Sequence, residues 1–394
     1  MKKIISIVAL LVFILSSCKK KEDSPIVGGS NIIQVTVQSE TGTAISGAEV
    51  ASGSVKSTTD GNGKATLSGV SVNDGKYNIK VIKDGYFEGY KNILKISETT
   101  AHNTTIKLIQ KQVLGTVDAN LPTTLSGGDY SLVFTGQGFV DKDGNSTTGN
   151  VTVYSRYISA TDLTKLAELM PGGDFAAIGN NGEIGTLISM GFTATEFVDQ
   201  NGKQVFPISG AATAEIELPT DASEALGVLG ANAWYYNDAI NSWSYGGNVQ
   251  KNGNKVKFEV KASIFGNCDV LSKKAKVKAK FYCNTKSNIQ KGNRVQLINE
   301  GIGLNGQWYR VTYQTETNEN GEILVEVPVF PNISTDYSIN INGNSMTISL
   351  QENQTLDLGE LDACNLSSID DTTTWIIYNG IKYFLPLPIK SARP

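Results

Sequence analysis

The sequence predicts an all-β protein made of tandem β-sandwiches, and three observations support this prediction. Short segments in which apolar and polar residues alternate recur from residue 31 onward, as in strands with one buried face. The chain contains 40 glycines, and many of them lie in turn motifs beside Asn or Asp. Charged residues make up 18% of the chain, which is below the usual share, and 394 residues suffice for about three domains.

The N-terminus predicts export and lipid attachment. Lys2 and Lys3 precede an apolar-dominated segment, residues 4–15, which has the length of a signal peptide rather than of a membrane span of about 20 residues. The segment ends in Leu15-Ser16-Ser17-Cys18, which resembles a bacterial lipobox. This resemblance implies that residues 1–17 are a signal peptide and that Cys18 carries the lipid, including palmitate-type chains, that holds the protein at the membrane.

Residues 18–30 are expected to form a lipid-anchored tether, because charged residues, Pro25, Gly28 and Gly29 follow the cysteine closely. The run Lys19-Lys20-Lys21-Glu22-Asp23 resembles the export signal that sends lipoproteins of Bacteroidota to the exterior face of the outer membrane. A solvated charge run beside anionic lipid explains the same residues. The expected location is therefore the outer membrane, with the choice between its inner and outer faces left open.

Residues 31–112 predict the first β-sandwich. Alternation at 33–37 and 77–81 indicates strands, and Asp60-Gly61-Asn62-Gly63 suits a tight hairpin turn rather than a calcium site, which needs six to eight oxygens. The Thr59–Gly63 turn and the pair Gly85-Tyr86 resemble the carboxypeptidase regulatory-like domain. The resemblance implies a seven-stranded transthyretin-like sandwich that has no catalytic residues.

Residues 113–273 predict a middle β-rich domain with one short helix near 160–170. Thr161 is the expected N-cap, Leu163, Leu166 and Met170 form one apolar stripe, and Pro171-Gly172-Gly173 ends the helix. The expected strands of this domain are 130–134, 151–154, 192–198, 214–218, 233–236 and 256–260.

Two segments of the middle domain carry a second resemblance. Trp234-Tyr235-Tyr236-Asn237 with Trp243, followed by Phe265-Gly266-Asn267-Cys268-Asp269, is similar to the central β-domain of cartilage intermediate layer protein. The chain departs from that pattern at Ser263-Ile264, where a His-containing segment is usual, so no function is transferred. We expect the aromatic residues to form a core rather than a ligand platform.

Residues 274–363 predict a second transthyretin-like or immunoglobulin-like sandwich, because Thr317–Ile323 repeats the pattern of Thr59–Leu67. Residues 364–394 then form a C-terminal hairpin and tail. Asn379-Gly380 suits a type I′ turn between residues 375–378 and 381–384.

The four cysteines suit an exported protein. With Cys18 assigned to lipid, Cys283 and Cys364 flank the last sandwich and are candidates for a disulfide. Cys268 would then stay buried and reduced. The chain has no C-x-x-C pair, which excludes a cysteine-based zinc site or a thioredoxin-like site.

The sequence offers little for catalysis. Its one histidine, His102, lies in a polar segment before an expected strand at 106–108, so we expect it to be exposed. The chain has no Gly-x-Ser-x-Gly elbow, no phosphate-binding loop and no second imidazole for zinc, so we expect no catalytic residue, no metal and no cofactor. Loss of residues 1–17 leaves a net charge of −6, which argues against nucleic acid.

Together these features favour a surface-exposed lipoprotein that binds an unknown protein or glycan without catalysis, as an adhesion protein does. Two alternatives stay open. One is a structural or accessory lipoprotein that docks on another envelope protein, and the other is a glycan hydrolase that uses paired carboxylates distant in sequence.

Overall fold

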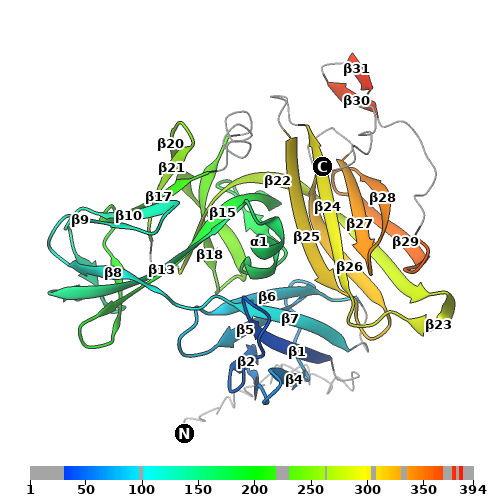
Figure 1. Ribbon diagram of the computed structural model, residues 1–394, viewed down its shortest axis with the longest axis horizontal. Coiled ribbons are helices and arrows are strands. Elements are labelled where there is room, and N and C mark those ends of the chain that lie inside the picture. Colours follow the sequence, from blue (N-terminus) through cyan, green and yellow to red (C-terminus); the bar gives the residue numbers. More distant parts are fainter. Residues whose placement is uncertain are drawn as a thin grey trace, which may run out of the picture.

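The computed structural model describes residues 31–96, 101–218, 230–261, 264–302, 308–329 and 335–366, and the backbone of β30 (Trp375–Tyr378) and β31 (Ile381–Phe384). Nearly all of its regular structure is β-strand, and one helix, α1 (Leu163–Leu169), occurs among the described residues (Figure 1). The expected all-β fold of tandem sandwiches is confirmed. Cys18 and the tether lie outside the described residues.

The first sandwich packs a three-stranded sheet on a four-stranded sheet. In the smaller sheet β1 is central, antiparallel to β4 and parallel to β7, and its inward residues Ile33, Val35 and Val37 are buried. The smaller sheet contains β4 (Lys64–Ser68), β1 (Ile32–Ser39) and β7 (His102–Leu108). The larger contains β3 (Val55–Thr58), β2 (Glu49–Ser52), β5 (Lys76–Ile82) and β6 (Gly89–Leu94).

The second sandwich repeats this arrangement. The C-terminal half of β22 (Phe265–Cys283) is antiparallel to β26 and parallel to β29, as β1 is to β4 and β7. Its smaller sheet contains β22, β26 (Glu322–Val329) and β29 (Thr355–Asp362), and β23 (Thr285–Ile289) pairs with the end of β22. Its larger sheet contains β25 (Trp308–Glu316), β24 (Arg294–Ile302), β27 (Thr335–Ile341) and β28 (Asn344–Leu350).

The two sandwiches also share a threonine that closes the turn before β4 in the first and before β26 in the second. Thr59 Oγ1 accepts a hydrogen bond from the backbone N–H of Ala48 at 2.9 Å. Thr317 Oγ1 accepts one from the backbone N–H of Asn293 at 2.8 Å. Both threonines are buried, so each hydroxyl satisfies a backbone group that water does not reach. The expected equivalence of the two turns is confirmed.

The glycine that ends each of these turns is required by close backbone approach. Gly63 and Gly321 have φ of +73° and +74°. A Cβ on Gly63 would lie 2.5 Å from the carbonyl oxygen of Val37, and one on Gly321 would lie 2.5 Å from that of Phe281. Any side chain would therefore be strained and would separate the turn from the neighbouring strand.

The middle unit is also layered. Its five-stranded sheet contains β20 (Gln250–Asn252), β21 (Lys255–Glu259), β17 (Ala212–Glu217), β10 (Tyr130–Phe134) and β9 (Thr123–Ser126). The facing sheet contains β8 (Val113–Asp118), β11 (Phe139–Val140), β12 (Ser146–Thr147), β13 (Asn150–Ser159), β14 (Ala176–Ile178), β15 (Ile184–Asp199), β16 (Gln204–Pro207), β18 (Asn232–Asn237), β19 (Ser242–Asn248) and the first half of β22. Between them lies a core that includes Leu132, Val153, Ile216 and Cys268.

Strand β22 belongs to two units at once. Residues 265–272 pair with β15, and from Lys273 onward the strand pairs with β26. The change of partners falls at the expected boundary near residue 273, but no linker separates the units there. The yellow-green ribbon of β22 runs from the middle unit into the second sandwich (Figure 1).

The helix differs from expectation in its cap. Asp162, and not Thr161, is the N-cap, because its carboxylate accepts from the backbone N–H of Lys165 at 2.9 Å. Thr161 is one residue too early to reach the free N–H groups of the first turn. Leu166 and Met170 are buried as expected.

One apolar cluster links all three units. It includes Phe87 and Tyr90 of the first sandwich, Leu166 of α1, Trp243 of the middle unit and Tyr313 of the second sandwich. Within the part of the chain that the structure describes, the three units therefore share a core. Separation of any one unit from the other two would therefore expose this apolar surface.

The C-terminal strands β30 and β31 pair with each other in a two-stranded antiparallel sheet, with Trp375 opposite Phe384. The expected hairpin strands are thus present, while Asn379-Gly380 lies outside the described residues. Among the described residues, no helix is long and apolar enough to cross a membrane.

Candidate functional site

A cleft of about 250 Å³ lies where the first sandwich, the middle unit and the second sandwich meet. Strands β6 and β7 form one wall, α1 and the loop after it form the second, and β24, β25 and β26 supply the third. Figure 1 shows α1 between these strands. The charged residues of its lining are Lys91, Lys107, Glu168, Asp174, Arg294, Glu316 and Glu326.

Lys76 joins all three units beside this cleft. Its amine on β5 lies 2.7 Å from Asp174 Oδ2 of the middle unit and 3.4 Å from Glu326 Oε2 of the second sandwich. Burial alone would lower the pKa of Lys76, but the two carboxylates outweigh it and hold the pKa above its ordinary value. The lysine therefore stays charged and ties three separate sheets together.

The buried carboxylate of Glu326 is neutralised by lysines of two units. Burial would raise the pKa of its carboxyl, but Lys76 and Lys274 outweigh burial and hold the pKa below the ordinary value. The Lys274 amine lies 2.9 Å from Glu326 Oε1. Glu326 is only 3% exposed, so this is a desolvated ion pair that has its counter-charges in place.

Glu168, on α1, makes the second three-way link. Its carboxylate lies 2.5 Å from the Lys107 amine of the first sandwich and 2.8 Å from the Arg294 guanidinium of the second sandwich. The helix places this side chain on the face opposite the buried stripe of Leu166 and Met170. The short helix thus orients one acid toward two bases from distant parts of the chain.

Asn92 fixes the wall formed by β6. Its side-chain amide donates to Asp174 Oδ1 at 3.1 Å and to the carbonyl of Asn241 at 2.8 Å. Its backbone N–H donates to the carbonyl of Gly172 at 2.8 Å. The edge of the first sandwich is therefore bonded to the loop that follows α1, and the cleft has a pre-formed wall.

Two lining residues, Lys91 and Glu316, are not part of any described ion pair. No described carboxylate lies within 4.0 Å of the Lys91 amine, which lies against the backbone of Gly173. Burial lowers the pKa of Lys91, while Glu316 and Asp174 act in the opposite direction. Burial raises the pKa of Glu316, while Thr105 and Lys91 act in the opposite direction.

His102 is buried, and the expectation of an exposed histidine is wrong. It is 2% exposed and begins β7, which pairs in parallel with β1 from Ile33 onward. The strand starts four residues earlier than expected, because His102 and Thr104 continue the inward alternation of Ile106. The His102 ring packs on Tyr77 with centroids 5.1 Å apart.

The chemistry of His102 is that of a neutral imidazole. Burial lowers its pKa to about 4, against a smaller opposing effect of Glu322. Its Nε2 atom has no hydrogen-bond partner among the described residues. A catalytic base needs a nucleophile and an orienting acid within hydrogen-bond reach, and the described hydrogen bonds assemble no such group around His102.

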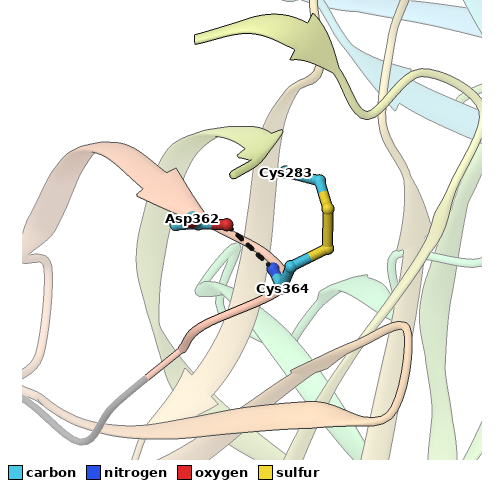
Figure 2. A group of neighbouring side chains, drawn as sticks. All are labelled: Cys283, Asp362 and Cys364. Atoms are coloured by element: carbon cyan, nitrogen blue, oxygen red, sulfur yellow. Dashed lines mark hydrogen bonds between the residues drawn. A yellow bond between two sulfur atoms is a disulfide. The ribbon is translucent and has the colours of Figure 1, made fainter. Parts of the chain in front are cut away.

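The structure joins Cys283, at the end of β22, to Cys364, just after β29, in a disulfide (Figure 2). Their Cα atoms are 5.0 Å apart, within the range that a disulfide requires. Asp362 accepts hydrogen bonds from the backbone N–H groups of Asn284 and Cys364, each at 3.0 Å. The ends of the parallel strands β22 and β29 are therefore joined by the disulfide and by the hydrogen bonds that Asp362 accepts.

The sulfur and carboxylate oxygen atoms of the same three side chains, Cys283, Asp362 and Cys364, lie within 4.8 Å of one another, which is close enough for a metal site. A metal needs thiolates, and the disulfide consumes both sulfur atoms. This group is therefore a structural link and not a ligand set.

The segment Asn267-Cys268-Asp269 packs into the interior of the middle unit. Cys268 is free and fully buried, and burial raises the pKa of its thiol. Burial also raises the pKa of Asp269 well above its ordinary value, and its carboxyl accepts from the backbone N–H of Met190 at 2.9 Å. Met190 lies where β15 shifts register against β22, so Asp269 satisfies a backbone group that the sheet leaves unpaired.

The aromatic cluster is core, as expected. Trp234 and Trp243 are 1% and 0% exposed. Each indole N–H donates to a backbone carbonyl, of Asp269 at 3.0 Å and of Pro171 at 3.1 Å respectively. Since both the ring faces and the polar atoms have partners, the cluster presents no surface on which a ligand could stack.

Asp60 is a turn residue, as expected. Its carboxylate accepts from the backbone N–H groups of Asn62 at 2.9 Å and Lys64 at 2.8 Å. Asp141 and Asp199 make the same pair of bonds two and four residues ahead. Lys203 and Asn145 hold the pKa of Asp141 well below its usual range.

Apart from His102, no residue of the cleft stands out as a candidate site residue in the sequence. Lys91, Glu168, Asp174, Arg294 and Glu316 come from strands, a helix and a loop spread over residues 91–316, and none belongs to a recognisable motif. Each reads in the sequence as an ordinary surface charge. The sequence pointed to one part of the cleft only: the helix, whose cap and stop residues mark the segment that contains Glu168 and Asp174.

Comparison with known proteins gives similarity to solved structures alone. No family model matches the chain, and no curated protein matches it. The Bacillus anthracis TIE protein is 14% identical, with 85% of this chain and 50% of that protein covered and a TM-score of 0.18. The major pilin subunit BcpA of Bacillus cereus is 10% identical over 85% of this chain and 99% of its own, with a TM-score of 0.17.

The full-length major pilin SpaD of Corynebacterium diphtheriae is 10% identical over 85% of this chain and 97% of its own, with a TM-score of 0.19. The chain thus spans half of the TIE protein and nearly all of each pilin. Identities and TM-scores of this size carry no argument about function. The function must be argued from the residues of this chain.

Proposed function

We propose that this protein is a lipid-anchored outer-membrane lipoprotein that faces the cell exterior and binds a protein or glycan, as an adhesion protein does, without catalysis. The observation that carries the binding role is the cleft. Its walls come from three units held together by Lys76 and Glu168, and its lining includes Lys91 and Glu316, which are not part of a described ion pair. A pre-formed cleft with a few convergent polar groups is the usual form of a binding site.

The lipid anchor rests on Leu15-Ser16-Ser17-Cys18 and its resemblance to a lipobox. Diacylglycerol on Cys18 and a third acyl chain on its amine supply the two or more chains that stable anchoring needs. Residues 19–30 then separate the first sandwich from the membrane surface, and the charges after Cys18 favour export to the exterior face.

The first sandwich keeps its proposed kinship with carboxypeptidase regulatory-like domains, and the middle unit its likeness to the β-domain of cartilage intermediate layer protein. Both rest on the quoted sequence motifs. The burial of Thr59 and the strained approach of Gly63 give a physical reason for the Thr-Asp-x-x-Gly pattern. These kinships imply a display scaffold and no reaction.

The glycan hydrolase alternative needs an acid with a raised pKa beside a second, ionised carboxylate that faces the substrate. Glu316 has a raised pKa, but the other acids of the cleft lining, Glu168, Asp174 and Glu326, are all ion-paired. This arrangement favours binding over hydrolysis.

The accessory-lipoprotein alternative is favoured by β30 and β31, which form a two-stranded sheet. A sheet of two strands is marginal in water and has two open edges to which a partner strand could add. In this case a variant lacking residues 371–394 would lose its envelope partner but keep ligand binding.

The proposal is tested with the mature lipidated protein, purified from membranes in detergent and applied to glycan and protein arrays. A reproducible partner, together with proteinase accessibility on intact cells, is the expected result. The proposal fails if no array component binds and the protein is accessible only after the outer membrane is broken.

A further inference from the structure

The cleft has polar groups that the protein itself leaves unsatisfied, and they differ in kind. Among the described residues, Lys91 supplies an amine without an ion-pair partner, and Glu316 supplies a carboxyl that is hydrogen-bonded to Thr105 but is not part of an ion pair. His102 Nε2 and Gln314 Oε1 are buried atoms without a hydrogen-bond partner. A native protein leaves few buried polar atoms without a hydrogen-bond partner. Because His102 and Gln314 both line this cleft, we expect a ligand to bind there.

We propose that this cleft binds a small zwitterion of amino-acid size, whose carboxylate accepts from Lys91 and whose ammonium donates to Glu316, His102 and Gln314. This inference goes beyond the proposed adhesion role, because it assigns the cleft a small ligand of its own. It names the chemical class of one ligand and the residues that select it.

The hydrogen-bond donors and acceptors of the cleft match those of a zwitterion. The Lys91 amine can only donate, so it needs an acceptor, and a carboxylate supplies a full opposite charge as well. The neutral imidazole of His102 and the amide oxygen of Gln314 accept hydrogen bonds, as do the carboxyl oxygens of Glu316. One ammonium group has three donors, which equals the number of these acceptors.

The remaining charges of the cleft do not compete for such a ligand. Glu168 is paired with Lys107 and Arg294, and Asp174 is paired with Lys76. These residues hold the walls in place, and a ligand need not displace them. Burial of Lys91 and Glu316 costs desolvation free energy. A ligand that carries both a carboxylate and an ammonium group would offset this cost at both side chains.

Size and lining argue against larger or purely hydroxylated ligands. A volume of about 250 Å³ corresponds to about eight water molecules, so the cleft can enclose an amino acid, whereas a glycan or protein partner could enter it only by one small group. No Phe, Tyr or Trp is among the described residues of the lining, so a sugar ring would find no aromatic face.

The test measures binding of single amino acids to the mature full-length protein in detergent by calorimetry. Each amino acid that binds is compared with its N-acetyl derivative, which lacks the ammonium, and with its amide, which lacks the carboxylate. We expect the free amino acid to bind and each blocked analogue to bind about tenfold more weakly or worse. Neutral monosaccharides of similar size form the comparison panel.

Variants then place the ligand. Lys91→Met removes the charge at nearly constant length and should reduce affinity about tenfold or more, and Glu316→Gln should do the same. Lys142→Met is the matched control, because Lys142 is 74% exposed on a remote turn. Thermal unfolding of each variant shows whether it is folded, and the blocked analogues test the wild type without any substitution.

The outcomes separate the two proposals. If no amino acid binds, or if binding ignores the blocked groups, Lys91→Met and Glu316→Gln, the zwitterion proposal is overturned and the cleft holds water. If it fails in this way while the arrays yield a partner, the general binding function stands. If amino acids bind as expected while the arrays yield nothing, the ligand proposal holds and the adhesion role falls.

Discussion

The Lys76 amine of the first sandwich lies 2.7 Å from the Asp174 carboxylate of the middle unit, and the two side chains are 18% and 10% exposed. The same carboxylate accepts from Asn92 at 3.1 Å. Because these contacts cross a unit boundary beside the cleft, they set how the two units meet. Their loss should be measurable as a loss of stability.

Asp174→Asn should lower the free energy of unfolding by about 2 kcal/mol, since Lys76 would lose one of its two carboxylates in a largely desolvated place. The midpoint of urea unfolding measures this effect. Asp143→Asn is the control, because the Lys142–Asp143 pair is exposed and should contribute nothing measurable. An unchanged midpoint in Asp174→Asn would mean that the Lys76–Asp174 pair does not help to hold the units together.

His102 should make the protein less stable in mild acid. Its pKa falls from 6.5 to about 4 on folding, so the unfolded chain binds the proton more tightly. The stabilisation is fully present above pH 6.5, declines as the pH falls from 6.5 to about 4, and amounts to about 3 kcal/mol at most. The difference between wild type and His102→Gln in urea unfolding at pH 7 and pH 4.5 isolates this contribution. Parallel pH profiles for the two proteins would contradict it.

Thr59→Val should cost about 1–3 kcal/mol, because the side chain keeps its shape but leaves the N–H of Ala48 and the carbonyl of Ile45 without their buried partner. Thr317→Val should have a similar effect in the second sandwich. Thr58→Val, on an exposed neighbouring position, is the control. Equal stability of Thr58→Val and Thr59→Val would show that the hydroxyl is not part of the structural requirement.

The cysteines should give a defined thiol count. Native protein that has not been reduced should not react with iodoacetamide, since Cys268 is buried and Cys283 is bonded to Cys364. Denaturation without reduction should expose one thiol per chain, which mass spectrometry would assign to Cys268. Alkylation of Cys283 or Cys364 under those conditions would exclude the disulfide. Cys283→Ser should destabilise the protein by about 2–4 kcal/mol.

Cys18→Ala should abolish lipid labelling. Cells fed an alkyne fatty acid would label the wild type and not the variant, which should accumulate as an uncleaved or released protein. Cys268→Ala should label normally and serves as the control. Labelled Cys18→Ala protein would refute the lipobox assignment.

Local patterns predicted the local structure well. The alternation at Ile33, Val35 and Val37 and the Asx turn at Asp60 appear where expected, because period-two burial and turn chemistry depend on residues within a few positions. The misplacement of His102 has the same origin. A polar residue on the inner face of a strand breaks the pattern, and only pairing with β1 shows that the strand extends to it.

By itself, the sequence determined the all-β class, the repeated turn of the two sandwiches and the short helix, since each is set by neighbours along the chain. Tertiary structure alone decided the continuity of β22 across two units, the shared core and the cleft. Lys76, Asp174 and Glu326 are isolated charges in the sequence, and Lys91 and Glu316 have no motif. Their meaning arises from desolvation and from distances between side chains that only packing brings together.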